Sequence, residues 1–221
     1  LFLMILFLMI LSNLTYNQMV ESISVMITAV GVFISLMSFA YTNWRIKSEE
    51  VNKNKKTLKL FDSLTKKERN NMIYYLSGLN RIEMNYTNYN QNTYEVTLQA
   101  NNKVIKTNNK RAFIIDKSME VIFENNVENE LNNYLNTIKA NLESNHVNLN
   151  DNSLGKITDK ITDLNDAIEL CKELTDIGNV YNAILSEVQL PIENQMDTNS
   201  LYGSYNKLKE KLKKLSNNLE D

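Results

Sequence analysis

The feature that most constrains this chain of 221 residues is a stretch of 23 residues, Ser22 to Trp44, that carries no charge. At about 1.5 Å per residue, a helix of that length crosses the roughly 30 Å hydrocarbon core of a bilayer. Tyr41 and Trp44 stand near its end, where aromatic side chains favour the membrane–water interface. A buried helix of a soluble core is the alternative, but such a helix seldom lacks a polar face over so many residues. The stretch predicts a membrane-spanning helix at 22–44.

A second apolar run, LFLMILFLMIL, opens the chain at Leu1. It is short for a span, and it lacks the basic start and small-residue exit of a secretory signal. If it extends to about Tyr16, residues 1–16 form a first span and Ser12 to Glu21 supply a short loop. The predicted membrane anchor, residues 1–44, is therefore a single helix or a helical hairpin.

Positive charge follows the uncharged stretch directly. Between Arg45 and Arg69 there are nine Lys or Arg residues and four Asp or Glu residues. Basic residues collect on the cytoplasmic side of a membrane, so either form of the anchor predicts a cytoplasmic C-terminal part. The single cysteine, Cys171, fits a reducing compartment, where we expect it to be a small buried apolar residue.

Residues 45–115 are predicted to form a basic juxtamembrane α+β region. In LTKKER, Thr65 and Glu68 have the spacing of a capping box, and Gly78 and Asn80 suit the end of the helix that it would start. Alternating apolar residues from Tyr94 to Ala100 and a turn at Asn101-Asn102 predict a hairpin, whose second strand runs from Lys103 to Lys106. RAFIID follows, before a helix expected near Asp116 or Lys117. A basic helix with a hairpin is typical of a winged-helix unit, and equally of any small α+β unit.

Residues 116–221 are predicted to form a helical bundle, which makes the fold mainly α. Three apolar stripes repeat with helical spacing, and Pro191, in a polar loop, separates the second from the third. The stripes are Val127, Leu131, Tyr134, Ile138 and Leu142; Leu154, Ile157, Ile161, Leu164, Ile168 and Cys171; and Leu201, Tyr205, Leu208, Leu212, Leu215 and Leu219. These helices either pack within one bundle or join copies of the chain into a homo-oligomer through 154–171 and 201–219.

Residues with catalytic chemistry are scarce. His146 is the only histidine, and no Cys or acid stands at metal-ligand spacing from it. The chain has no phosphate-binding glycine loop, no G-x-S-x-G and no H-E-x-x-H. The carboxylates from Asp159 to Asp176 are spaced as the solvated outer face of a helix. We therefore predict no catalytic residue, no metal, no cofactor and no enzymatic activity.

The order of the N-terminal features resembles a known family. Two hydrophobic segments, a basic exit, the LTKKER helix and the hairpin EVTLQANNKVIK resemble the superinfection-exclusion B proteins of temperate phages, over about residues 1–125. In length, anchoring and Asn/Lys-rich helical character the whole chain is similar to the lactococcal abortive-infection P proteins. Both resemblances imply a bacterial, membrane-anchored cytoplasmic phage-defence protein, and the second implies nucleic-acid binding.

Three uses of the basic region remain open. The first is sequence-independent binding of nucleic acid, with single strands preferred, in which Tyr74, Tyr75, Tyr86 and Tyr89 offer stacking faces to unpaired bases. The second is contact of the nearest lysines with anionic lipid, worth about 1 kcal/mol each. In the third, the protein is a membrane-tethered assembly or partner-binding module and the charges only set its orientation. The candidate phosphate-binding residues are Lys53, Lys55, Lys56, Lys59, Lys66, Lys67, Arg69, Lys103, Lys106, Lys110 and Arg111.

Overall fold

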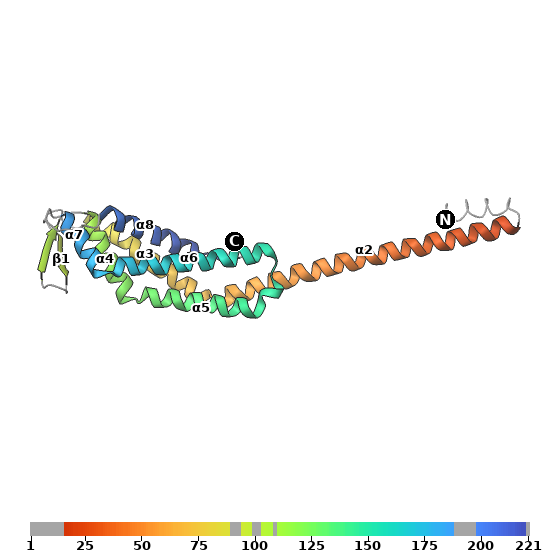
Figure 1. Ribbon diagram of the computed structural model, residues 1–221, viewed down its shortest axis with the longest axis horizontal. Coiled ribbons are helices and arrows are strands. Elements are labelled where there is room, and N and C mark those ends of the chain that lie inside the picture. The colour runs from red at the N-terminus through yellow and green to blue at the C-terminus, as the bar shows by residue number, and fades with distance from the viewer. Residues whose placement is uncertain (1–15, 89–93, 99–102, 108–109, 188–197, 220–221) are drawn as a thin grey trace. The chain divides into compact units, whose positions relative to one another are not determined.

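The computed structural model describes residues 16–88, 94–98, 103–107, 110–187 and 198–219, and it is mainly helical (Figure 1). The chain divides into two compact units, residues 1–52 and 53–221, which are described one at a time. The predicted first span at 1–16 lies outside the described residues except for Tyr16, and Pro191 lies outside them as well.

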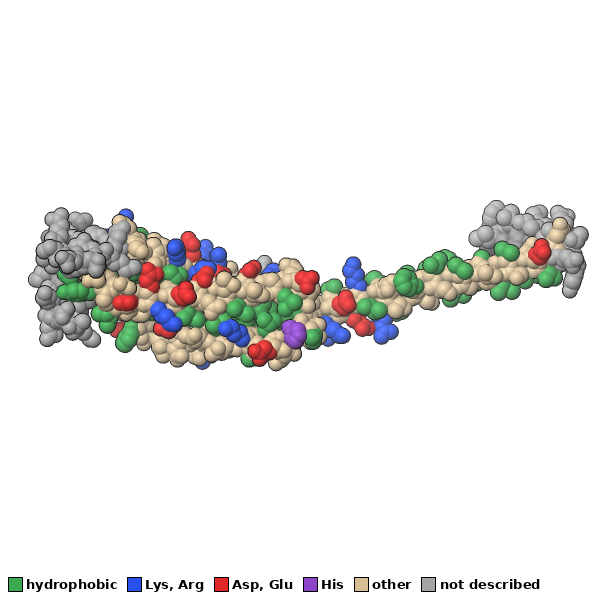
Figure 2. Space-filling model, in the orientation of Figure 1, with side chains coloured by type: hydrophobic (Ala, Val, Ile, Leu, Met, Phe, Trp, Pro, Cys, Tyr) green, Lys and Arg blue, Asp and Glu red, His purple; other side chains and the backbone are tan. Residues whose placement is uncertain are grey.

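The described part of the first unit belongs to helix α2 (Tyr16–Leu64). Its large apolar side chains between Val25 and Trp44 are exposed, and Trp44 is 67% exposed. Figure 2 shows these side chains along the part of α2 that precedes the first lysines. By its length and composition, α2 is apolar enough to cross a membrane. The prediction of one long apolar N-terminal helix is therefore confirmed.

Hydroxyl groups inside the apolar part of α2 are satisfied within the helix itself. Thr28, Ser35 and Thr42 each donate a hydrogen bond to the carbonyl oxygen four positions earlier, at 2.9, 2.9 and 2.8 Å. Because hydrocarbon offers no partner for a polar group, such internal bonds let small hydroxyl residues lie in a spanning helix at little cost.

The loop expected from Ser12 to Glu21 is wrong in its described part. Residues 16–21 are helical and continue without interruption into the apolar stretch. No glycine or proline stands between Ser12 and Glu21. Polar residues alone do not stop a helix, because the backbone ladder needs neither a particular side chain nor an apolar face.

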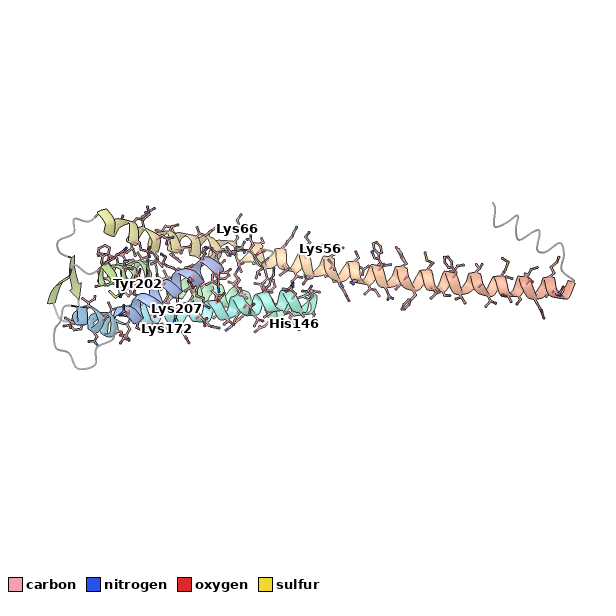
Figure 3. All side chains as sticks on the ribbon, turned by 90° about the horizontal axis from the view of Figure 1, so that it is seen from above. Lys56, Lys66, His146, Lys172, Tyr202 and Lys207 are labelled. Carbon is pink, nitrogen blue, oxygen red and sulfur yellow. The ribbon has the colours of Figure 1, made fainter. Side chains whose placement is uncertain are left out.

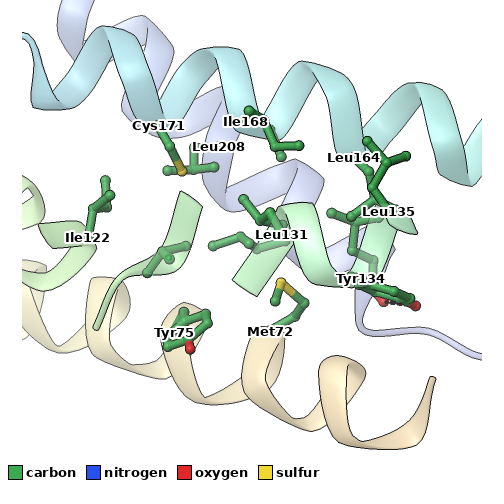
Figure 4. Close-up of a cluster of buried hydrophobic side chains, with 14 of the residues drawn as sticks. Met72, Tyr75, Ile122, Leu131, Tyr134, Leu135, Leu164, Ile168, Cys171 and Leu208 are labelled. Atoms are coloured by element: carbon green, nitrogen blue, oxygen red, sulfur yellow. Dashed lines mark hydrogen bonds between the residues drawn. The ribbon is translucent and has the colours of Figure 1, made fainter. Parts of the chain in front are cut away.

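The second unit is built around one apolar core. Side chains from six helices meet in it, including Phe61 near the end of α2. Figure 4 shows Met72 and Tyr75 opposite Leu131, with Ile168 and Cys171 across the core. The three predicted stripes supply most of these side chains, with Leu142, Leu154 and Ile161 only partly buried. The helices of this unit besides the end of α2 are α3 (Lys66–Asn88), α4 (Lys110–Glu124), α5 (Val127–Asn145), α6 (Asp151–Thr175), α7 (Ile177–Glu187) and α8 (Thr198–Leu215).

The two stripes that could either pack within one bundle or join copies of the chain are buried within the chain. α6 and α8 pack along each other, and Leu164, Leu208 and Leu212 are completely buried between helices of the same unit. Packing within one bundle, the first of the two alternatives, is thus the arrangement that these leucines adopt here.

The small α+β unit, winged-helix-like or otherwise, is not supported. Strands β1 (Tyr94–Leu98) and β2 (Lys103–Thr107) pair antiparallel with Val96 opposite Ile105. The helix before them, however, runs on to Asn88 and packs against α4, α5 and α8. α4 begins at Lys110 instead of near Asp116, so RAFIID is helical. The elements around the hairpin therefore belong to the helical bundle.

Two sequence features account for this error. Gly78 was expected to end the helix, but it lies inside α3 and faces α4, where a Cβ built on it would lie 3.4 Å from Val121 Cγ1. The run from Ala112 to Ile115 is buried on every side. A short continuous apolar run has no period that separates a buried strand from a buried helix.

The predicted capping box at Thr65 is also wrong. The Thr65 hydroxyl donates to the Phe61 carbonyl at 2.7 Å, and the backbone N–H of Arg69 donates to the Thr65 carbonyl at 3.0 Å. The helical hydrogen-bond pattern thus continues through the joint between α2 and α3. Thr65 is buried inside a helical connection and does not begin a free helix.

Candidate nucleic-acid interface

Six of the predicted lysines surround the joint between α2 and α3 in the second unit, and all six are exposed. Lys55 and Lys59 lie one turn apart on the side of α2 opposite the buried residues Thr57 and Phe61. Figure 3 shows Lys56 and Lys66 apart from Lys172 of α6 and Lys207 of α8. The six are Lys53, Lys55, Lys56, Lys59, Lys66 and Lys67; we call them the joint lysines.

Within the described part of the chain, none of the joint lysines forms an ion pair or a hydrogen bond. Other lysines of the same unit do. Lys209 contacts Glu83 at 2.8 Å, and Lys211 contacts both Asp163 and Asp166 at 2.6 Å. The joint lysines therefore keep their full charge available to an external anion.

Arg69, predicted to bind phosphate with these lysines, occupies a different place. It is 8% exposed, and its guanidinium donates to Asp62 and to the Thr65 hydroxyl, both at 2.9 Å. Asp62 in turn accepts the backbone N–H of Leu219 at 3.0 Å. Through Asp62, Arg69 thus connects the α2–α3 joint to the segment after α8, and its guanidinium is already paired inside the protein.

The structure does not bring the second predicted group to the joint. The positive charge of Lys110 helps to lower the pKa of Glu83, so Lys110 lies near that carboxylate. Glu83 is about 25 Å along α3 from Lys66. Arg111 donates to Asn199 and lies 5.6 Å from the ring centre of Tyr202, so its guanidinium contacts α8. Lys103 and Lys106 lie on β2, and their side chains are outside the described part.

The candidate stacking tyrosines separate clearly. Tyr74 is 65% exposed on α3, whereas Tyr75 is 6% exposed and belongs to the core. The side chains of Tyr86 and Tyr89 lie outside the description. Arg81, which is exposed on the same helix, was not predicted as a site residue because the helix was expected to end near Asn80. In a helix that continues past Asn80, its spacing of seven residues from Tyr74 would have placed the two on the same side.

Carboxylates of α3 are held against the bundle. The Glu83 carboxylate accepts from Lys209 at 2.8 Å and from the Tyr205 hydroxyl at 3.1 Å. Burial alone would raise the pKa of Glu83, but these two donors outweigh it and hold the pKa below its ordinary value. One carboxylate oxygen of Glu68 is also fully buried. Neither carboxylate therefore lies where it would repel an anion bound on the outer side of α3.

A pocket of about 890 Å³ on the bundle carries the opposite charge. Asp116, Glu120, Glu124 and Glu128 are among its described lining residues. These carboxylates would repel phosphate, so the pocket is a poor site for nucleic acid.

Cys171 and His146, the single cysteine and histidine, whose side chains could take part in catalysis or metal binding, lie in positions typical of structural residues. Cys171 is buried, and burial raises the pKa of its thiol to about 12. His146 begins a short 3-10 turn, η1 (His146–Asn148), with its Nδ1 3.1 Å from the Glu143 carbonyl oxygen. Across the described ranges, no three His, Cys, Asp or Glu side chains are grouped to hold a metal ion.

No family model, curated protein or solved structure matches this chain.

A buried lysine gives this unit a measurable pH dependence. Lys160 Nζ donates to the Asn217 carbonyl at 2.6 Å and lies 5.8 Å from the ring centre of Tyr134. Burial, assisted by the nearby positive charge of Arg69, lowers the pKa of Lys160 from 10.5 to about 8. Between these two values the unfolded chain keeps a proton that the folded protein has released.

Stability should therefore rise with pH in that interval. We expect the free energy of unfolding of the natural protein, relative to Lys160→Met, to increase by about 1–2 kcal/mol between about pH 7.5 and 9.5. Urea unfolding of the full chain in zwitterionic micelles, followed by circular dichroism, measures it. Lys139→Met, at an exposed position, should show no such trend. A difference for Lys160→Met that does not change with pH would contradict the lowered pKa.

Proposed function

We propose that this protein is a membrane-anchored nucleic-acid-binding protein whose second unit lies in the cytoplasm. The observation that carries the proposal is the group of six exposed joint lysines, for which the described part of the chain provides no carboxylate partner. Unpaired lysine ammoniums around the joint attract the phosphates of any strand and release its counterions on binding. Such contacts carry no sequence information, so the binding is sequence-independent.

The membrane anchor is the exposed apolar part of α2. Burying its side chains in hydrocarbon removes a long apolar surface from water, and its hydroxyl groups need no outside partner. The basic residues that follow Trp44 favour the cytoplasmic side for everything after them. We place the protein in a bacterial cell membrane because of its resemblance to phage-exclusion and abortive-infection proteins.

Exclusion of phage is the biological setting that this resemblance favours. A nucleic-acid-binding unit tethered to the inner face of the membrane meets incoming phage DNA where it enters the cell. Of the joint lysines, Lys66 and Lys67 are furthest from Trp44 along the chain. Screening by salt limits the attraction between a lysine and anionic lipid to about 8 Å, so a binding effect of these two lysines indicates nucleic acid and not lipid.

Binding should be strongly salt-dependent. We expect the full chain in zwitterionic nanodiscs to bind a labelled oligothymidine tightly at about 50 mM salt and much more weakly at about 200 mM. In the variant Lys55→Ala/Lys59→Ala/Lys66→Ala/Lys67→Ala, the slope of log affinity against log salt should fall by about 3, since each phosphate contact to a single strand contributes about 0.7. Fluorescence anisotropy gives both slopes.

A control variant of equal charge separates local from overall electrostatics. Lys139→Ala/Lys207→Ala/Lys213→Ala/Lys214→Ala removes four exposed lysines of α5 and α8 that are not among the joint lysines, and it should leave the slope close to that of the natural protein. Equal losses in both variants would mean that only net charge matters. Absence of binding at low salt would reject the proposed function.

The orientation can be tested by fusion to the C-terminus. A green fluorescent protein fused after Asp221 should fluoresce, because it folds in the cytoplasm, and a periplasmic alkaline phosphatase fused there should be inactive. The reverse pattern would place the second unit outside the cytoplasm and would remove its access to intracellular nucleic acid.

The biological role can be tested by plating phage on bacteria that express the chain. We expect fewer plaques for at least some members of a phage panel, recovery of plaques with the four joint-lysine substitutions, and continued protection with the control variant of equal charge. If expression at the membrane protects against none of the phages, the phage-exclusion setting is wrong, whether or not the protein binds DNA in vitro.

A further inference from the structure

The charged residues of α3 are distributed by sign, with positive charges on the exposed side and carboxylates towards the bundle. Of the charged side chains in this helix, Lys66, Lys67 and Arg81 are exposed. Arg69 is buried against Asp62, and Glu83 is bonded to α8 through Lys209 and Tyr205. Both carboxylates, Glu68 and Glu83, therefore face the bundle, and every exposed charge that α3 presents is positive.

The exposed residues follow a single line along the helix. Lys67, Tyr74 and Arg81 are seven residues apart in turn, which places them above one another at intervals of about 10 Å on the side opposite Met72 and Leu79. Asn70, also exposed, stands between the first two. We call Lys67, Asn70, Tyr74 and Arg81 the α3 stripe; it is about 21 Å long.

Tyr74 is the unusual member of this stripe. Its ring is 65% exposed, although a tyrosine that served packing would be largely covered. It meets Tyr75 edge to face with ring centres 5.8 Å apart, and Tyr75 is fixed in the core (Figure 4). Tyr75 thus contacts the Tyr74 ring, and most of the Tyr74 side chain remains exposed to solvent.

An exposed aromatic ring between two cations is the pattern that single-stranded nucleic acid recognises. An unpaired base stacks on the ring, and the flanking cations hold the phosphates on either side of that base. Double-stranded DNA gains only the phosphate contacts, because its bases are already stacked on one another. Ile73, also exposed beside Tyr74, adds apolar surface for a base without adding charge.

We infer that the α3 stripe is a binding track for single-stranded nucleic acid, in which Tyr74 stacks on a base and Lys67 and Arg81 bind the adjoining phosphates. This inference rests on the nucleic-acid binding proposed above and extends it in two respects. It adds Arg81, on a part of α3 remote from the joint lysines, and it gives a physical cause for a preference for single strands.

The test compares two ligands on the full chain in zwitterionic nanodiscs. We expect Tyr74→Ala to weaken binding of an oligothymidine of about 20 nucleotides by about 5- to 100-fold, and to change binding of a duplex of similar length by less than about twofold. Tyr74→Phe, which keeps the ring, should bind as the natural protein does. Arg81→Ala should lower the salt slope for the oligothymidine by about 0.7.

Two substitutions serve as matched controls. Phe123→Ala removes an aromatic side chain that is 78% exposed on α4, and Lys139→Ala removes an exposed cation on α5; neither should alter binding. Circular dichroism checks that each variant remains helical.

The outcomes distinguish the two proposals. If the natural protein binds oligothymidine and both Tyr74→Ala and Arg81→Ala bind it equally well with the same salt slope, the α3 stripe is overturned while the joint lysines stand. If Tyr74→Ala weakens duplex and single strand alike, stacking is overturned as its role. If the natural protein binds neither ligand, the proposed function fails and the stripe fails with it.

Discussion

The packing of α8 into the core is the interaction on which the rest of the second unit depends. α8 contacts α3, α4, α6 and α7, and its apolar stripe is buried along its length. The hydroxyl of its buried Tyr205 lies 3.0 Å from the Leu79 carbonyl oxygen and 3.1 Å from the Glu83 carboxylate, so its single proton is shared between these two acceptors of α3. The segment after α8 reaches Asp62 at the end of α2, where the Leu219 N–H is bound. α8, the last helix of the chain, thus joins helices that are far apart in the sequence into one packed unit.

Buried charged side chains of this unit bind other parts of the protein, whereas the joint lysines are exposed. Among the buried charged groups, Arg69 is bonded to Asp62 of α2, and Lys160 is bonded to the segment after α8. Removing one partner of such a group would leave an uncompensated charge in a poorly hydrated place, which costs several kcal/mol. The joint lysines make no such bond within the described residues, and this is why they are better candidates for binding an external anion than Arg69 is.

The sequence was most informative where a pattern was long and regular. The uncharged stretch before Trp44 identified the apolar helix, and the stripes that include Leu131, Leu164 and Leu208 identified the helical core, because three or more turns of helical spacing admit few other structures. It was least informative around Gly78 and in RAFIID. There the decisive facts are a close approach between α3 and α4 and burial on all sides, and neither is a local property of the chain.

Of the candidate site, the exposure of the joint lysines could be anticipated from their density, but the fate of Arg69 could not. A basic residue beside Lys66 and Lys67 reads as one of the same group, and only the fold turns it inward towards Asp62. The same applies to Tyr74 and Tyr75, which are adjacent in sequence and opposite in environment. Which side of α3 faces the core depends on the other helices, so sequence composition alone does not decide it.

The charge sorting of α3 has a consequence for how this segment can vary in length. Each residue added to or removed from a helix rotates everything beyond it by about 100°. A single insertion or deletion between Tyr74 and Arg81 would rotate Arg81 away from the line of Tyr74. It would also move the Glu83 carboxylate away from Lys209 and Tyr205, which it contacts at 2.8 and 3.1 Å. Substitutions at exposed positions would be tolerated more readily than a change in residue count, so the spacing within α3 is a stricter requirement than the identity of most of its exposed residues.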